Sequence, residues 1–115
     1  MPQRTRRLTA QGIERVMRKG ARYAGASFFI RVLPGAEGTS RMGVVVGRKV
    51  AKKAVRRNYY KRVLRHTLRT LLNGSERAWD VAVVANPAIA EQPFAELEKE
   101  LRAAAHEAGI LGEKR

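Results

Sequence analysis

The sequence predicts an α+β fold, with a small mixed β-sheet and helices covering one of its faces, on three observations. Three stretches repeat their apolar residues at helical spacing, and four others are short runs of strand-forming residues bounded by turns. These segments follow one another in the order α-β-β-β-α-β-α. The 115 residues contain no repeat and no long linker, so a single domain with one core is expected.

The first helix is predicted over residues 9–19. Thr9 is a residue type that caps helix N-termini, and Gly20 is one that ends helices. Leu8 and Ile13 have the spacing of a hydrophobic staple across the first turn. Local signals therefore indicate where this helix begins and where it ends.

Four segments read as strands. Residues 28–33 and 41–47 are rich in Val, Ile and Phe, and the turn cluster 34–40 between them predicts that they pair as a hairpin. A short strand is expected just before Gly25, and a last strand over 78–85. Beyond this hairpin, these patterns do not predict the order of the strands in the sheet.

Two longer helices complete the prediction. The second covers residues 54–73 and ends at Asn73–Gly74, and the third begins close to Pro93, which suits a first helical turn. One apolar face of the third helix is marked by Phe94, Leu97, Leu101, Ala104, Ala105 and Ala108.

The charge is high and unevenly distributed. Lys and Arg number 24 against 10 Asp and Glu, giving +14. Residues 1–75 hold 19 basic and 2 acidic side chains, a net +17, whereas residues 76–115 hold 5 basic and 8 acidic ones, a net −3. Such a polarised charge predicts a polyanionic partner on one side of the molecule. We expect residues 1–7 to be a flexible basic arm, 8–110 a single domain that binds this partner and 111–115 a short tail.

The second predicted helix gathers its charges. On a helical wheel Tyr60, Val63, Leu64, Thr67, Leu68 and Leu71 form a core stripe. Asn58, Lys61, Arg62, Arg65 and Arg69 fall on a neighbouring arc, with Arg57 near its border and Tyr59 pointing away from it. Like charges four residues apart destabilise a helix by about 0.2–0.5 kcal/mol per pair. Phosphates would relieve that repulsion and release counterions.

RNA is the polyanion that fits best. The apolar side of the helix lacks Trp and Phe and is needed for the core, which argues against a membrane surface. No short helix with a tight turn precedes it, as a DNA-reading helix-turn-helix would require. Strands come first instead, and RNA is recognised by shape and backbone.

The chain lacks the usual parts of a hydrolytic site. It has no cysteine, and His66 and His106 have no third ligand at metal spacing. The basic half offers only Glu14 and Glu37, and no phosphate-binding loop of the nucleotide type occurs. We therefore predict no catalytic side chain and no protein-held metal. The lack of an apolar membrane span and of a secretory signal predicts a cytoplasmic protein.

The stretch RKVAKKAVRRNYYKRVLRHTLR resembles the basic "RNR" helix of the bacterial ribonuclease P protein family. Arg57–Asn58 match the start of that signature, and Lys61–Arg62 and Arg65 its continuation. RLTAQGIERVMRKG, RMGVVVGRKV, WDVAVVANP and FAELEKELRAA are similar to the flanking elements, so the resemblance spans about residues 6–108. Tyr59 stands where the family usually has arginine.

The resemblance implies a fold like domain 2 of ribosomal protein S5 and a role in maturing the 5′ end of tRNA. A catalytic RNA working with Mg²⁺ would hydrolyse the precursor, with Mg²⁺ bound by RNA and substrate rather than by the protein. The protein would bind that RNA and the 5′ leader of precursor tRNA. Two alternatives stay open from the residues alone: a structural RNA-binding protein of ribosomal type, and a self-sufficient ribonuclease.

Two sets of site residues are predicted, the first from charge clustering and the second from family position. The set expected to bind the RNA subunit is Lys52, Lys53, Arg56, Arg57, Asn58, Lys61, Arg62, Arg65 and Arg69. The set expected to line a leader cleft between the first helix and the sheet is Ile13, Met17, Phe28, Arg31, Arg48 and Lys49.

Overall fold

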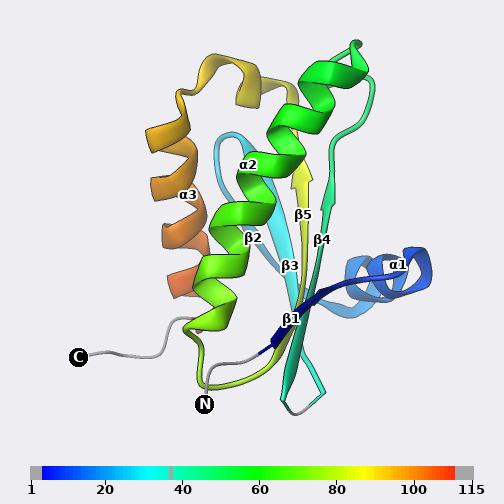
Figure 1. Cartoon of the computed structure of the whole chain (residues 1–115), viewed down its shortest axis with the longest axis vertical. Helices are drawn as coiled ribbons and strands as arrows, with labels where there is room; N and C mark the ends of the chain where they lie inside the picture. The colour runs from blue at the N-terminus through cyan, green and yellow to red at the C-terminus, as the bar shows by residue number, and fades with distance from the viewer. Residues whose placement is uncertain (1–3, 37, 111–115) are drawn as a thin grey trace.

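A computed structural model describes residues 4–36 and 38–110, which form one sheet with helices on both faces (Figure 1). The elements are β1 (Arg4–Arg7), α1 (Ala10–Lys19), β2 (Ala21–Ala24), β3 (Phe28–Pro34), β4 (Thr39–Val45), α2 (Ala54–Asn73), β5 (Trp79–Ala85), the 3₁₀ helix η1 (Pro87–Glu91) and α3 (Phe94–Glu107). The three α-helices and the four expected strands are confirmed. None of the helices in these ranges is long and apolar enough to cross a bilayer.

The sheet has the strand order β1-β4-β5-β3-β2, so the predicted pairing of β3 with β4 is wrong. Strand β5 lies between them, parallel to β4 and antiparallel to β3. The reason is burial: Val81, Ala82 and Val83 are all fully buried, so successive side chains of β5 need cover on both faces. A strand of that kind belongs in the middle of a sheet. The hairpin of this sheet is formed by β2 and β3 instead.

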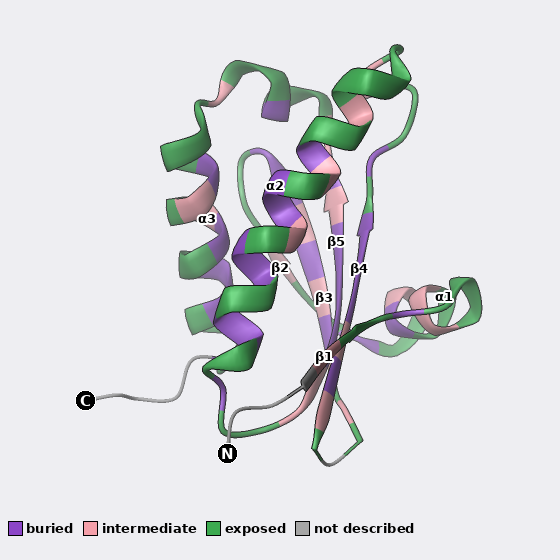
Figure 2. Ribbon diagram, viewed as in Figure 1, coloured by how far each residue is buried: buried purple, intermediate pink, exposed green. Residues whose placement is uncertain are grey.

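The two faces of the sheet carry different helices, which corrects the expectation that all helices cover one face. The larger core lies beneath α2 and α3 and contains Phe28, Ile30 and Val83 (Figure 2). A smaller cluster on the opposite face joins α1 to the sheet through Val16 and Ala82. Because side chains alternate along a strand, neighbouring residues of β5 serve the two cores in turn.

Helix α1 lies close to the sheet because Gly43 has no side chain. A Cβ placed on Gly43 would lie 2.7 Å from the side chain of Ile13, closer than real Cβ contacts come. The predicted N-cap is confirmed, since the Thr9 hydroxyl accepts a hydrogen bond from the Gly12 N–H at 3.0 Å. Gly20 follows the last residue of the helix, as expected.

Residues 4–7 are not a flexible arm, and that prediction is wrong for them. They form β1, which pairs in parallel with β4 in the register Thr5↔Ser40 and Arg7↔Met42. The Thr5 hydroxyl also donates to the side-chain oxygen of Asn73 at 2.5 Å, which ties the strand to the end of α2. The remainder of the predicted arm, residues 1–3, and the predicted tail, 111–115, lie outside the described residues.

Candidate nucleic-acid interface

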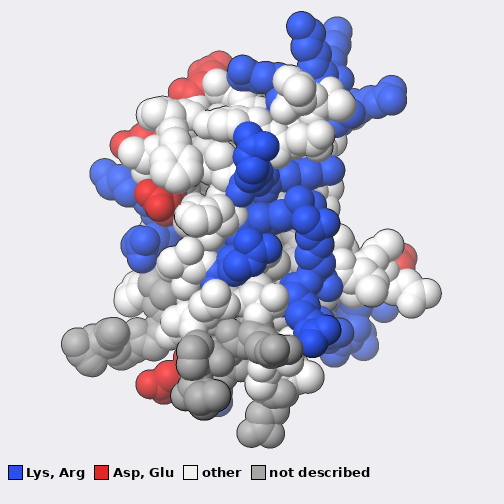
Figure 3. All heavy atoms as spheres, viewed as in Figure 1, with Lys and Arg blue, Asp and Glu red and all other residues white. Residues whose placement is uncertain are grey.

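The candidate interface is a shallow groove between α2 and β1, called here the α2 groove. It encloses about 430 Å³ and is lined by Arg7, Asn58, Arg62, Arg65, His66 and Arg69. Lys and Arg atoms form a band over α2 and β1, while most of the red Asp and Glu atoms in this view lie on the side of α3 (Figure 3). The fold therefore gathers cations that lie about sixty residues apart in the sequence.

Helical spacing explains why α2 can line the groove and also support the core. Its buried residues are Tyr60, Val63, Leu64, Thr67, Leu68, Leu71 and Leu72, as the predicted stripe requires. Asn58, Arg62, Arg65 and Arg69 recur every three or four residues on the opposite side, which faces solvent (Figure 2). These four were all among the predicted RNA-binding residues, and the structure brings them together.

The groove cations have no acidic partner within residues 4–36 and 38–110. The salt bridges of these ranges join Arg15 and Arg41 to Asp80 and Lys99 to Glu96, and none includes a residue of α2. An anionic ligand would therefore meet guanidinium groups that are not already neutralised by carboxylates.

Burial and the repulsion between neighbouring cations both act on Arg65. Burial lowers the pKa of its guanidinium below the usual value, and the nearby charges of Arg7 and Arg69 lower it further. A lowered pKa means that the folded chain disfavours this positive charge. The groove is thus a place where the protein holds cations against their mutual repulsion.

Arg7 and His66 are the groove residues that the sequence prediction missed, and Arg7 is the one that comes from another element. Strand alternation points Thr5 and Arg7 to the α2 face and Arg6 to the other. A four-residue segment with three arginines shows no apolar pattern of its own. The available signal was Leu8, which is buried and brings the chain end against the sheet.

The comparisons with known proteins agree on one family. The Ribonuclease P family model matches residues 1–109. The chain is 33% identical to the ribonuclease P protein component of Dehalococcoides mccartyi (strain CBDB1), covering 96% of this chain and 90% of that protein. It is 32% identical to the protein of the same name from Microcystis aeruginosa, covering 96% of each.

The chain belongs to the ribonuclease P protein family. This membership supports a subunit role in the 5′ maturation of tRNA and does not favour the alternative of a ribosomal-type structural protein.

Solved structures of ribonuclease P proteins share the fold. The Staphylococcus aureus protein superposes with a TM-score of 0.81 at 21% identity, covering 93% of this chain and 97% of that one. The Thermotoga maritima protein gives 0.71 at 24% identity, covering 84% and 92%. The expected fold, like domain 2 of ribosomal protein S5, is confirmed for this family member.

The remaining residues of the predicted RNA-binding set do not line the α2 groove. Lys61 is half-buried beside it, and Lys53 and Arg56 are exposed at the start of α2. Arg56 donates to the Tyr60 hydroxyl at 2.9 Å. Arg57 turns back toward the loop before the helix, where its Nη1 donates to two backbone carbonyl groups.

Tyr59 does contact the basic arc, contrary to the expectation from the helical wheel. The Arg62 guanidinium carbon lies 5.9 Å from the centre of the Tyr59 ring, within the range of a cation–π contact. The ring also packs edge-on against Tyr60, with 5.4 Å between centroids. In this family member the tyrosine therefore supports a neighbouring arginine.

The residues predicted for the leader cleft are divided between separate places. Ile13 and Met17 pack against the small cluster under α1. Arg31 lies on the same face of the sheet and donates to the Gly20 carbonyl oxygen at 3.0 Å. Phe28 was predicted on the wrong face: it is fully buried in the larger core beneath α2 and α3.

Phe29 takes the place that was predicted for Phe28. Alternation along β3 puts Phe29 on the α1 face with Arg31, and the guanidinium carbon of Arg22 lies 4.4 Å from its ring centre. The last two predicted cleft residues, Arg48 and Lys49, line a different hollow of about 450 Å³ together with Lys52.

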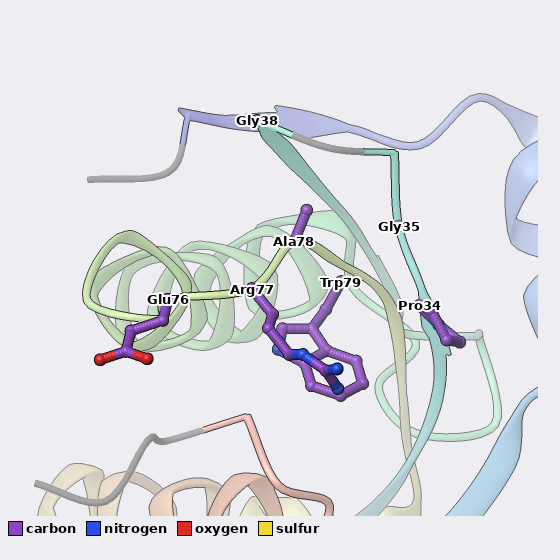
Figure 4. A pocket seen from close by; sticks show the side chains of 7 residues that line it. All are labelled: Pro34, Gly35, Gly38, Glu76, Arg77, Ala78 and Trp79. Atoms are coloured by element: carbon purple, nitrogen blue, oxygen red, sulfur yellow. The ribbon is translucent and has the colours of Figure 1, made fainter. Parts of the chain in front are cut away.

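A further hollow, of about 590 Å³, lies where α2 leads into β5 (Figure 4). Trp79 forms part of its wall, with the indole N–H donated to the Ser75 hydroxyl at 3.1 Å. Arg77 and Glu76 also line it. A single arginine beside a glutamate gives this hollow mixed charge, so it does not continue the basic α2 groove.

Metal-binding side chains are dispersed in the part of the chain that the structure describes. No three His, Asp or Glu residues gather there at metal distance. His66 lies in the α2 groove among arginines, and His106 is exposed on α3. The geometry of these ranges is that of an anion-binding surface.

Proposed function

We propose that this family member is the protein subunit of ribonuclease P and that its α2 groove binds the RNA subunit. The observation that carries the proposal is the convergence of four arginines with no carboxylate partner in the described ranges. RNA phosphates would supply the negative charge that the groove lacks, and counterions would be released on binding. Asn58 would add a hydrogen-bonding group for a base or a sugar.

We propose further that the RNA subunit, with Mg²⁺, hydrolyses the phosphodiester bond of precursor tRNA. Metal-assisted hydrolysis by a protein needs clustered metal-binding side chains, usually carboxylates. Asp80 is the acidic residue that is buried in the described part of the chain, and its carboxylate is already paired with Arg41 and Arg15. In this proposal Mg²⁺ is bound by RNA and substrate, and the protein screens phosphate repulsion in the cytoplasm, where we expect it to work.

The 5′ leader of precursor tRNA would bind on the α1 face of the sheet. This face combines apolar side chains with a cation, from Ile13, Met17, Phe29 and Arg31. In this proposal Phe29 replaces Phe28 as the aromatic residue, because Phe28 is buried in the other core. Single strands bind where aromatic faces lie beside positive charge.

The test of the RNA-binding surface is a titration of the ribonuclease P RNA at several salt concentrations. Arg62→Ala with Arg69→Ala should weaken binding at least tenfold and reduce the slope of log affinity against log salt by about 2, one phosphate per arginine. The matched control is Arg77→Ala with Arg102→Ala, which removes two exposed arginines outside the groove. Equal losses in the two double variants would contradict the assignment of the groove.

A second measurement separates this proposal from a self-sufficient ribonuclease. The pure protein, incubated with precursor tRNA and Mg²⁺ but without the RNA subunit, should leave the 5′ leader in place. Correct 5′ cleavage by the protein alone would refute the division of labour proposed here. Sequencing the RNA crosslinked to the protein in cells would identify the partner directly.

A further inference from the structure

The loop between β4 and α2 presents three cations from a short segment. Arg48, Lys49 and Lys52 are exposed and line the same hollow of about 450 Å³. Three like charges within five residues repel one another, and a loop of this kind would sample many conformations if its backbone were not held.

The first part of the loop is held by its own backbone and by the core. The N–H groups of Val50 and Ala51 donate to the Gly47 carbonyl oxygen at 3.0 and 3.3 Å. Val50 and Ala51 also pack against the larger core. Among the described residues no backbone N–H donates to the carbonyl groups of Ala51 and Lys52.

The side chain of Arg57 donates to both of these carbonyl groups. Its Nη1 donates to the Ala51 carbonyl oxygen at 3.0 Å and to the Lys52 carbonyl oxygen at 2.6 Å. The side chain of Arg57 is half-buried. Lys53, the N-cap residue of α2, makes no side-chain capping hydrogen bond. Among the contacts of the described residues, Arg57 is therefore the side chain that ties the end of this loop to the helix.

We propose that Arg57 is a positioning residue: it fixes the β4–α2 loop so that Arg48, Lys49 and Lys52 form a preformed phosphate-binding surface. The inference rests on the proposed function, since RNA is the partner that would use this surface. A loop that is already ordered before binding avoids the entropy cost of ordering it in the complex. Arg57 then acts on RNA through the loop and not through a phosphate of its own.

Hydrogen exchange of the free protein tests, without RNA, whether Arg57 holds the loop in place. Arg57→Gln should speed exchange of the amide groups in residues 50–53 about tenfold, while exchange in β5 stays as it was. Arg62→Gln is the matched control, because it removes an exposed arginine of the same helix that makes no backbone contact with the loop. Unchanged loop exchange in Arg57→Gln would overturn the inference.

A double-mutant cycle with the ribonuclease P RNA tests the route by which Arg57 acts. In a chain whose loop is unchanged, Arg57→Gln should weaken binding of the RNA about tenfold. In a chain whose Arg48, Lys49 and Lys52 are all replaced by Gln, the same change should have an effect of less than about twofold, because the residues it positions are gone. A full, additive loss in both backgrounds would mean that Arg57 contacts RNA itself, and the inference would fall.

The two tests also separate this inference from the proposed function. Arg57→Gln that loosens the loop while neither it nor Arg62→Gln changes RNA affinity would contradict RNA binding at this end of α2. The phosphate-binding role of the loop would then fall with it. If Arg57→Gln left amide exchange in the loop unchanged and Arg62→Gln weakened RNA binding as expected, the α2 groove would still be the RNA-binding site. Only the positioning role of Arg57 would then be refuted.

Discussion

Two arginine clusters on opposite faces of the sheet have opposite surroundings. Under α1, Arg41 donates to both carboxylate oxygens of Asp80 at 3.1 and 2.9 Å, and Arg15 lies 3.6 Å from the same carboxylate. In the α2 groove, Arg7 and Arg65 face other cations and no carboxylate of the described ranges. The arginines of the first cluster share a carboxylate of the protein itself, whereas those of the second are left for a ligand.

The pKa shifts show the difference in sign. The hydrogen bond to Asp80, and then its charge, raise the pKa of Arg41, so the fold favours that cation. Burial and neighbouring cations lower the pKa of Arg65, so the fold disfavours that one. An arginine's contribution thus depends on what surrounds it, and a count of basic residues does not separate structural cations from those that bind RNA.

The largest expected effect is on the cluster around Asp80. Asp80→Asn should lower the free energy of unfolding by about 2 kcal/mol, because a carboxylate that is 1% exposed loses charge-assisted hydrogen bonds. Urea denaturation measures this. Glu96→Gln, which removes an exposed pair with 4.0 Å between Lys99 and Glu96, is the control and should change stability by less than about 0.5 kcal/mol. Equal losses of stability in Asp80→Asn and Glu96→Gln would show that the Asp80 pairs do not stabilise the fold, and would contradict the difference between the two clusters.

The second prediction concerns the groove cation on β1. Arg7→Ala should weaken binding of the RNA subunit by about threefold to tenfold and reduce the salt slope by about 1. Arg6→Ala removes the same charge from the next residue, whose side chain points to the other face. If Arg6→Ala and Arg7→Ala weakened binding alike, the effect would belong to net charge and not to the groove.

A smaller effect is expected at Tyr59. Tyr59→Ala removes the ring beside which the Arg62 guanidinium lies, and should weaken RNA binding by about twofold to fourfold, as an exposed cation–π contact allows. Tyr59→Phe keeps the ring and should bind as the parent does. A loss in Tyr59→Phe would instead assign the contact to the hydroxyl group.

The sequence predicted α1 and α2 well because their signals are local. Thr9 and Gly20 delimit α1, and the stripe from Tyr60 to Leu71 defines the core side of α2 and, by exclusion, its basic side. Four of the five groove residues on α2, all except His66, followed from that wheel. These features need no knowledge of what lies next to the helix.

The features that sequence reasoning missed depend on partners distant in sequence. The turn cluster after β3 suggested a hairpin, but the position of β5 in the sheet depends on its need for cover on both faces. Arg7 joins the groove only because β4 has an edge to which β1 can add. Phe28 and Phe29 are identical residues, and alternation separates them only once the face that α1 covers is known.

The central claim is that the α2 groove holds its cations at a cost to the free protein that RNA removes. Arg65→Met tests it most directly, since methionine keeps an unbranched apolar side chain and lacks the charge. We predict that the free variant is more stable than the parent by about 0.2–0.5 kcal/mol in urea denaturation, and that its complex with the RNA subunit is weaker. A free variant that is clearly less stable would show that the protein itself neutralises Arg65, and would contradict the account.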